Sequence, residues 1–183
     1  VGALNVLAKH RRQARWEVED HLDRDDLFSR VEAEEAEPGS LSPLEIMSYL
    51  ERLQADYAGL GLTVGNHPMR AAREALPDVW RARDLPEGRD GQRVTIGGQV
   101  NCRQRPGSAK GVVFISLEDE TGVSNSVVYG KLFENNRLTI SQEPYLKITG
   151  LLQKKEGVIH VRAERIAPLA LENLPSGGSH DFS

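Results

Sequence analysis

The sequence predicts a mainly β protein with an α leader, in which a five-stranded barrel follows several short helices. The first observation is the alternation of apolar and polar residues in five runs between Val94 and Ile166. A period of two places neighbouring side chains on opposite faces of a strand, so each run has a core face and an outer face. The second observation is the turn chemistry between the runs, such as Pro106-Gly107 and Glu156-Gly157.

The elements of the barrel follow in chain order. We expect strands at residues 94–105, 112–117, 123–129, 145–153 and 158–166, with a short helix at 131–137. In the first strand the core parity carries Val94, Ile96, Val100 and Cys102, and Gly97-Gly98 indicates a bulge or a sharp bend. Five strands with a helix between the third and the fourth is the order of an OB-fold. Closure into a barrel removes the exposed edges that short strands otherwise leave.

The non-core parity of the first strands predicts a binding face. It carries amide, guanidinium and hydroxyl groups around one aromatic ring: Gln99, Asn101, Arg103, Arg105, Phe114 and Ser116, with Asn125 as a neighbour. A ring of this kind stacks on an unpaired base, amides reach the base edges, and arginines meet phosphate. Three lysines, Lys110, Lys154 and Lys155, fall in the two loops where OB-folds close on their ligands. The plainer interpretation is that Phe114 packs under the leader helices and the polar residues are only solvated.

Composition and charge limit the kinds of partner that the chain can bind. The chain has 183 residues and a net charge of -4, which divides into +4 for residues 92–169, -6 for residues 1–91 and -2 for the tail. A basic barrel beside an acidic leader indicates a polyanion partner for the barrel alone. The single cysteine excludes a disulfide framework, and we interpret Cys102 as a small buried residue rather than a reactive thiol. With no apolar run of about 20 residues and no signal peptide, we expect a cytoplasmic fragment of a longer polypeptide that binds no membrane.

The rest of the chain divides into three leader parts ahead of the barrel at residues 92–169 and a tail after it. We expect a helical end of an upstream DNA-binding region at 1–22, an acidic linker at 23–40, a helical connector at 41–91 and a flexible tail at 170–183. Arg11 and Arg12 could contact the backbone of duplex DNA, or simply lie on a solvated helix face. The connector helix should begin near Leu41, with Ser42 and Glu45 forming a capping box, and should end at Gly59 and Gly61. A second short helix is expected at residues 69–76.

No catalytic centre is visible in the sequence. Phosphate-binding glycine loops, nucleophile elbows and paired zinc-binding histidines are all missing. The carboxylate run Glu118-Asp119-Glu120 leads into a turn at Gly122, so a turn-capping role is favoured over a metal site. His67, directly before Pro68, is interpreted as a cap or packing residue.

Several motifs resemble the C-terminal region of bacterial error-prone C-family DNA polymerases, which are relatives of the polymerase III alpha subunit. The motifs span residues 103–114 and 117–122 in the barrel, 11–17 in the leader, Gly61-Leu62 with residues 67–69, and residues 179–182. The resemblance implies that the chain belongs to a longer DNA-directed DNA polymerase that acts in translesion synthesis. It also implies Mg²⁺ in the parent enzyme, with no cofactor and no catalytic residue in this stretch, and partners in a mutagenesis complex and the sliding clamp. Asn101 and Cys102 depart from the apolar residues expected there.

Three functional interpretations stay open. The first is a polymerase module that binds the single-stranded DNA template. The second is an anticodon-binding OB domain of an aminoacyl-tRNA synthetase, which residues 114–119 also resemble. The third is a protein-interaction barrel in which Phe114 and its neighbours meet another subunit.

Overall fold

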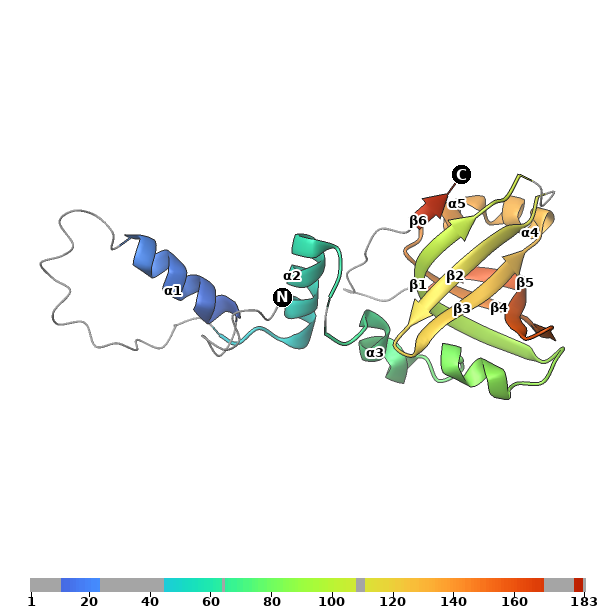
Figure 1. Cartoon of the computed structure of the whole chain (residues 1–183), viewed down its shortest axis with the longest axis horizontal. Coiled ribbons are helices and arrows are strands. Elements are labelled where there is room, and N and C mark those ends of the chain that lie inside the picture. The colour runs from blue at the N-terminus through green and yellow to red at the C-terminus, as the bar shows by residue number, and fades with distance from the viewer. Residues whose placement is uncertain (1–10, 24–44, 64, 108–110, 170–179, 183) are drawn as a thin grey trace, which may run out of the picture.

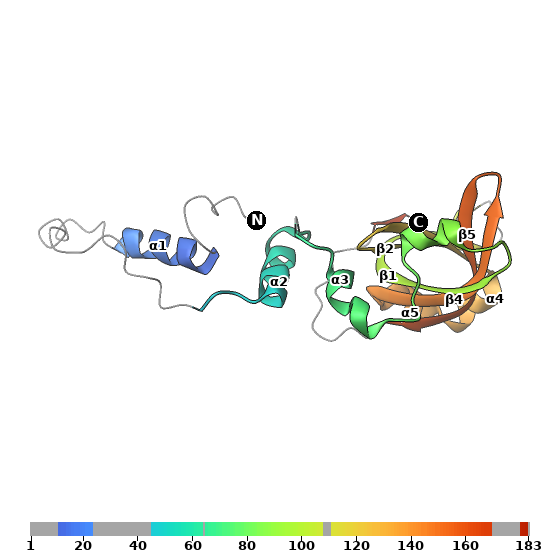
Figure 2. The same cartoon turned by 90° about the horizontal axis from the view of Figure 1, so that it is seen from below.

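The computed structural model describes residues 11–23, 45–63, 65–107, 111–169 and 180–182 (Figure 1). The strands in these residues are β1 (Arg93–Gln104), β2 (Val113–Asp119), β3 (Gly122–Val128), β4 (Tyr145–Lys155), β5 (Val158–Pro168) and β6 (His180–Phe182). The α-helices are α1 (Arg11–Asp23), α2 (Tyr49–Leu60), α3 (Pro68–Ala72), α4 (Gly130–Asn135) and α5 (Arg137–Gln142), with 3-10 helices η2 (Arg73–Ala75) and η3 (Ala82–Glu87). Figure 2 shows α1 and α2 extending to one side of the barrel.

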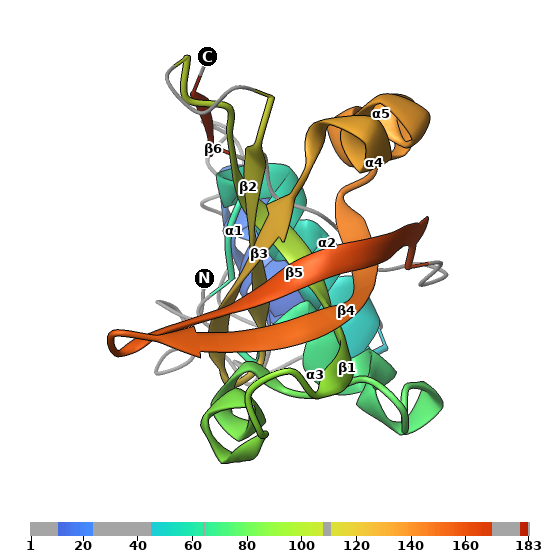
Figure 3. The ribbon, with the colours of Figure 1, turned by 90° about the vertical axis from the view of Figure 1, so that its right-hand side faces the viewer.

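Strands β1 to β5 close into the predicted barrel. The hydrogen-bonded order is β2-β3-β5-β4-β1, and an additional β2–β1 pairing completes the ring (Figure 3). Strands β3 and β5 run parallel and join through only two residue pairs, Ser126 with Val161 and Val127 with Arg162. The mainly β architecture and the barrel predicted from the sequence are confirmed.

The core lies inside the barrel and follows the predicted alternation most closely in β2. Val113, Ile115 and Leu117 are buried, whereas Phe114 is exposed. In β4, Leu146 and Ile148 are buried as expected, but Leu152 takes the third core position in place of Leu151. Burying a side chain of this size stabilises the fold by roughly 1.5–3 kcal/mol.

A bulge in β1 overturns the predicted parity of its second half. Val100 pairs with Leu117, but Cys102 pairs with Ser116, so Asn101 is an extra residue with no partner of its own. One inserted residue moves all later side chains to the opposite face of a strand. Cys102 is therefore half-buried on the outer side, which corrects its predicted core position, and Arg103 lies opposite the inward-facing Ile115.

Two glycines mark the places where strands approach most closely. A Cβ on Gly98 would lie 2.4 Å from the Glu118 carbonyl oxygen, across the β1–β2 pairing. A Cβ on Gly150 would lie 2.0 Å from the Arg162 carbonyl oxygen, next to a register shift between Thr149 and Gly150 in the β4–β5 pairing. The bulge is therefore not at Gly97-Gly98, where a bulge or sharp bend was expected, because the extra residue Asn101 is three positions after Gly98.

The helices differ from the predictions mainly at their ends. Helix α2 begins at Tyr49, later than the predicted start near Leu41, with Ser48 as N-cap and a capping box of Ser48 and Glu51. Ser42, which was predicted to form a capping box with Glu45, lies outside the described residues. The predicted end of α2 is confirmed, because Gly61 adopts a left-handed conformation with φ of 69°. The single helix expected at 131–137 is two short helices, α4 and α5. The expected acidic linker lies outside the described residues, apart from its first residue, Asp23, at the end of α1.

Strand β6 was not predicted, because the chain's end was interpreted as a tail. It pairs in parallel with β1, where Cys102, Arg103 and Gln104 face His180, Asp181 and Phe182. Of the tail's other residues, 170–179 and 183 lie outside the described part of the chain.

The connector ahead of the barrel is fixed to it by an ionic cluster. Arg73 donates to both carboxylate oxygens of Glu120 at 2.8 and 2.9 Å and also lies 3.5 Å from Asp119. Asp119 accepts from the backbone N–H groups of Thr121 and Gly122 and from that of Ala82, which confirms its turn-capping role. Val79 and Leu85 are buried, and Leu85 belongs to the barrel's own core.

This cluster predicts a pH-dependent contribution to stability. Burial raises the pKa of Glu120, but hydrogen bonds from Arg73 and the charges of Arg73 and Arg81 outweigh it, so the net pKa is lowered. Glu120→Gln should lower the free energy of unfolding at neutral pH by about 2 kcal/mol. Because a lowered carboxylate pKa stabilises the folded state only while the group is ionised, this difference should shrink as the pH falls below 4.5.

Urea unfolding of the parent and the variant at a series of pH values measures this difference. Glu134→Gln is the matched control, since Glu134 is exposed and lies 4.0 Å from Arg105. A Glu120→Gln difference that stayed constant down to about pH 2 would show that packing, not charge, is lost.

Candidate nucleic-acid interface

The outer face of β2 and β3 carries the exposed aromatic residue predicted from the sequence. Phe114 is 40% exposed and so does not pack under the leader helices. Ser116 donates to the Asn125 side-chain oxygen at 2.8 Å, which places these two predicted residues side by side across β2 and β3. Phe114, Ser116 and Asn125 therefore form an open surface with one ring and two polar groups.

Arg162 and Tyr129 lie on this face but were not predicted from the sequence. In the register of the sheet, Phe114 pairs with Val127, and Val127 pairs in turn with Arg162 of β5. Since Val161 points into the core, Arg162 lies on the outer face, two strands away from the ring. Tyr129, 50% exposed, follows Val127 by two positions and is the diagonal neighbour of Phe114. Only the strand register brings these residues together.

Gln99 and Asn101 lie toward the opposite end of β2, where the leader meets the barrel. Gln99 pairs with Glu118 and accepts a hydrogen bond from the Tyr57 hydroxyl at 3.4 Å. Asn101 donates to the Glu118 carboxylate at 2.9 Å. The leader thus contacts this end of the face and leaves Phe114 open.

Arg103 and Arg105 do not share the face of Phe114, which corrects the predicted set. After the bulge, Arg103 donates to the carbonyl oxygens of Ile140 and Glu143 at the end of α5. Arg105 lies over the Phe133 ring, 5.0 Å from its centroid. Both guanidiniums stabilise the helical end of the barrel rather than flanking the exposed ring.

The predicted loop lysines have different positions. Lys110 lies outside the described residues. Lys154 donates through its ammonium group to the Pro86 carbonyl oxygen, and its backbone N–H donates to Asp90, so it holds the connector. Lys155 is exposed at the end of β4. Of the three, Lys155 is the one that the structure describes as accessible to a ligand.

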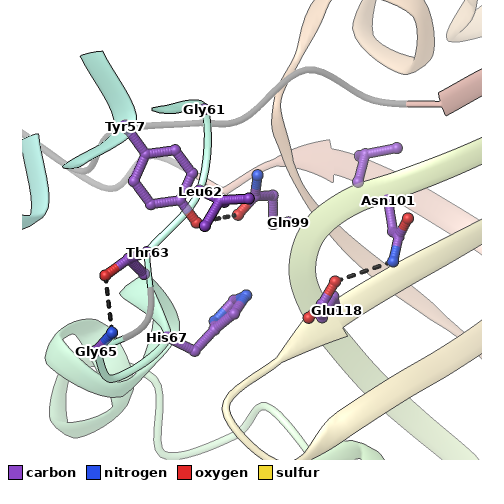
Figure 4. Close-up of a pocket in the computed structure, with 10 residues that line it drawn as sticks. Tyr57, Gly61, Leu62, Thr63, Gly65, His67, Gln99, Asn101 and Glu118 are labelled. Atoms are coloured by element: carbon purple, nitrogen blue, oxygen red, sulfur yellow. Dashed lines mark hydrogen bonds between the residues drawn. The ribbon is translucent and has the colours of Figure 1, made fainter. Parts of the chain in front are cut away.

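A cavity of about 420 Å³ lies between the α2 region and the barrel (Figure 4). Tyr57, Leu62 and His67 form one side, and Gln99, Asn101 and Glu118 form the other. His67 caps α3 by accepting from the Met69 N–H at 3.2 Å through Nδ1, which confirms its predicted role as a cap. Burial lowers the pKa of His67, against the opposing charges of Glu118, Asp119 and Glu120.

The leader's Arg12 is already paired. It donates to Glu51 at 2.9 Å and to the Glu45 carbonyl oxygen at 3.2 Å, which joins α1 to α2. The side chain of Arg11 lies outside the described residues. A duplex contact through Arg12 would have to replace these bonds.

The described residues do not fit the Mg²⁺ that the resemblance implies for a parent polymerase. They contain no group of three or more His, Cys, Asp or Glu residues that could hold a metal ion. Each member of the run Glu118-Asp119-Glu120 is engaged elsewhere, by Asn101, by the turn and by Arg73 respectively.

Within the described residues, no helix is long and apolar enough to cross a membrane.

Comparison with known proteins agrees with this geometry. Residues 94–169 match the family described as "OB-fold nucleic acid binding domain". The barrel is an OB-fold. Among solved structures, asparaginyl-tRNA synthetase from Pyrococcus horikoshii aligns with 49% of this chain and 21% of its own at 21% identity, with a TM-score of 0.39.

The OB-fold and the residues ahead of it are similar to error-prone DNA polymerases. That of Azoarcus sp. (strain BH72) is 40% identical over 171 residues, covering 92% of this chain and 16% of the relative. That of Anaeromyxobacter sp. (strain K) is 37% identical over 184 residues, covering 99% of this chain and 16% of the relative. The resemblance to this family is confirmed, and the chain spans about 16% of the length of these curated relatives.

Proposed function

We propose that this chain is the single-stranded-DNA-binding portion of an error-prone DNA polymerase that acts in translesion synthesis. The observation that carries the proposal is the outer row Phe114, Val127 and Arg162 across β2, β3 and β5 of an OB-fold, in which the Phe114 ring is exposed, Val127 is buried and Arg162 is half-buried. OB-folds bind nucleic acid on this face, between the loop that follows the first strand and the loop that joins the last two. The polymerase context comes from the similarity of nearly the whole chain to error-prone DNA polymerases.

The chemistry of the row suits an unpaired strand. An exposed ring stacks on any base, and a neighbouring guanidinium neutralises a backbone phosphate. Ser116 and Asn125 add hydroxyl and amide groups that can reach base edges. A duplex hides its base faces within the stack, so a flat ring on a strand has nothing to stack on there. The face therefore favours single-stranded over duplex DNA.

The remaining parts of the proposal come from the family alone. Nucleotidyl transfer and its Mg²⁺ belong to the parent polymerase, outside the residues described here. A mutagenesis complex and the sliding clamp are its proposed protein partners. The role of this chain within that assembly is to hold the unpaired template next to the polymerase site.

Fluorescence anisotropy with labelled oligonucleotides of about 15 nucleotides tests the proposal. Single-stranded DNA should bind more tightly than duplex DNA and than tRNA. With about two phosphate contacts, each contributing a slope of about -0.7, affinity should fall about sevenfold between roughly 50 and 200 mM salt. Arg162→Gln should reduce that slope by about 0.7, since it removes one cation from the row.

The control is Arg137→Gln, an exposed arginine at the start of α5. It should leave the slope unchanged. Tighter binding of tRNA than of DNA would support an anticodon-binding domain instead, and no binding of any nucleic acid would support a protein-interaction barrel.

A further inference from the structure

We propose that the cavity between the α2 region and the barrel is a pocket for one unpaired guanine base of the bound strand. The inference rests on the proposed function and extends it from a stacking face to a base-selective site. The cavity of about 420 Å³ falls within the range of roughly 300–1,000 Å³ that is usual for small-molecule sites. Its lining combines one aromatic ring with several polar groups (Figure 4).

The pocket lies on the path of a strand that stacks on Phe114. Phe114, Ser116 and Glu118 share the outer parity of β2, and the four positions from Phe114 to Glu118 span about 13 Å. At about 3.4 Å per stacked nucleotide, a strand covers that distance in four nucleotides or fewer. The base that follows those at Phe114 thus reaches the cavity without leaving the barrel's surface.

The barrel side of the pocket offers hydrogen-bond acceptors. Glu118 uses Oε2 to accept from Asn101 at 2.9 Å, which leaves Oε1 available on the cavity side. The Asn101 bond uses one amide hydrogen, so the amide oxygen can accept from a ligand. A carboxylate oxygen that faces the cavity favours a partner with N–H donors.

The leader side offers a donor and a stacking surface, and Gln99 on the barrel side offers a second donor. His67 accepts the Met69 N–H through Nδ1, so the neutral ring carries its proton on Nε2, where it can donate. Gln99 accepts from Tyr57 through its oxygen, which leaves its amide hydrogens to donate. The hydrogen bond to Gln99 also holds Tyr57, whose ring forms the wall on which a base can stack.

Guanine matches this arrangement better than the other bases do. Its Watson–Crick edge places the N1–H and N2–H₂ donors side by side, where they can donate to the Glu118 carboxylate, with the O6 and N7 acceptors left for the donors of His67 and Gln99. Adenine and cytosine present a ring acceptor toward the carboxylate, and thymine presents a single donor. Each of these leaves at least one polar group of the pocket unpaired.

Anisotropy with three oligonucleotides of about 15 nucleotides tests the pocket. One is all thymine, the second carries guanine at alternate positions, and the third carries hypoxanthine in place of guanine and so lacks the 2-amino group. The guanine oligonucleotide should bind about fivefold more tightly than the thymine one, and hypoxanthine should lose most of this advantage. Glu118→Gln should bring the guanine-to-thymine ratio close to one.

Glutamine can still accept the Asn101 hydrogen bond, so this variant should fold, and its thermal unfolding checks that. Leu62→Trp is a second variant, because Leu62 is 53% exposed at the rim and a larger ring there would fill the cavity. Leu62→Trp should also bring the ratio of guanine to thymine oligonucleotide affinities close to one. Glu134→Gln should leave that ratio at about five.

The outcomes separate this inference from the proposed function. Equal binding of the guanine and thymine oligonucleotides overturns the pocket but leaves the single-strand face intact. A guanine preference that survives both Glu118→Gln and Leu62→Trp places recognition elsewhere and also overturns the pocket. Failure to bind any oligonucleotide overturns both.

Discussion

Phe114→Ala should weaken the binding of single-stranded DNA by about tenfold or more. The ring is 40% exposed on the outer face of β2, and stacking of a base on such a ring contributes roughly 1–3 kcal/mol. Because the side chain points away from the barrel's interior, removing it should change the melting temperature little. Anisotropy titrations of the parent and the variant, at one fixed salt concentration, measure the loss.

Leu138→Ala is the matched control for this variant. Leu138 is 71% exposed on α5, so its replacement by alanine removes a comparable amount of exposed apolar surface at a site away from the proposed face. It should bind DNA as the parent does. Equal affinities for the parent and the Phe114→Ala protein would rule out the ring as a stacking platform, while Tyr129→Ala would then show whether its diagonal neighbour serves instead.

Gly150→Ala should lower the free energy of unfolding by about 3 kcal/mol or more. The added methyl carbon would lie 2.0 Å from the Arg162 carbonyl oxygen and 2.7 Å from its carbonyl carbon, both of which are backbone atoms that cannot rotate away. Overpacking of this kind typically costs about 1–3 kcal/mol, and here it also pushes on the β4–β5 pairing beside its register shift. Urea unfolding followed by tryptophan fluorescence measures the change.

Gly107→Ala provides the comparison, since a Cβ there meets no atom within 4 Å. Its free energy of unfolding should stay within about 0.5 kcal/mol of the parent's, as for most surface substitutions. A Gly150→Ala protein as stable as the parent would mean that β4 and β5 can separate there at no cost. The close approach at this position would then not limit the barrel's stability.

The barrel was predictable because its strands carry local signals. In β2, alternation alone placed Val113, Ile115 and Leu117 inside and Phe114 outside. Asp119 and Gly122 likewise marked the following turn by their chemistry, and the structure confirms it. Such features depend on a few consecutive residues, so the sequence contains the information directly.

The binding face was less predictable because it depends on register. Nothing in the residues of β1 shows that Asn101 is the extra one, so Arg103 and Arg105 were assigned to the wrong side. The two capping boxes of the connector illustrate a second limit: Ser42 with Glu45 and Ser48 with Glu51 satisfy the same pattern, and the structure uses the second. Arg162 and β6 reach their places through pairings between residues far apart in the chain.

The connector's attachment bears on where this module physically begins. The family match starts at residue 94, one residue after β1 begins, yet Leu85 fills part of the barrel's core and Trp80 pairs with Ile96. Met69 packs in a buried cluster with Tyr145 and Leu169, so the hydrophobic interior extends to the first residues of α3. The packed unit therefore begins at Pro68, some twenty-five residues before the family match, and a fragment cut at residue 94 should lose part of its hydrophobic interior.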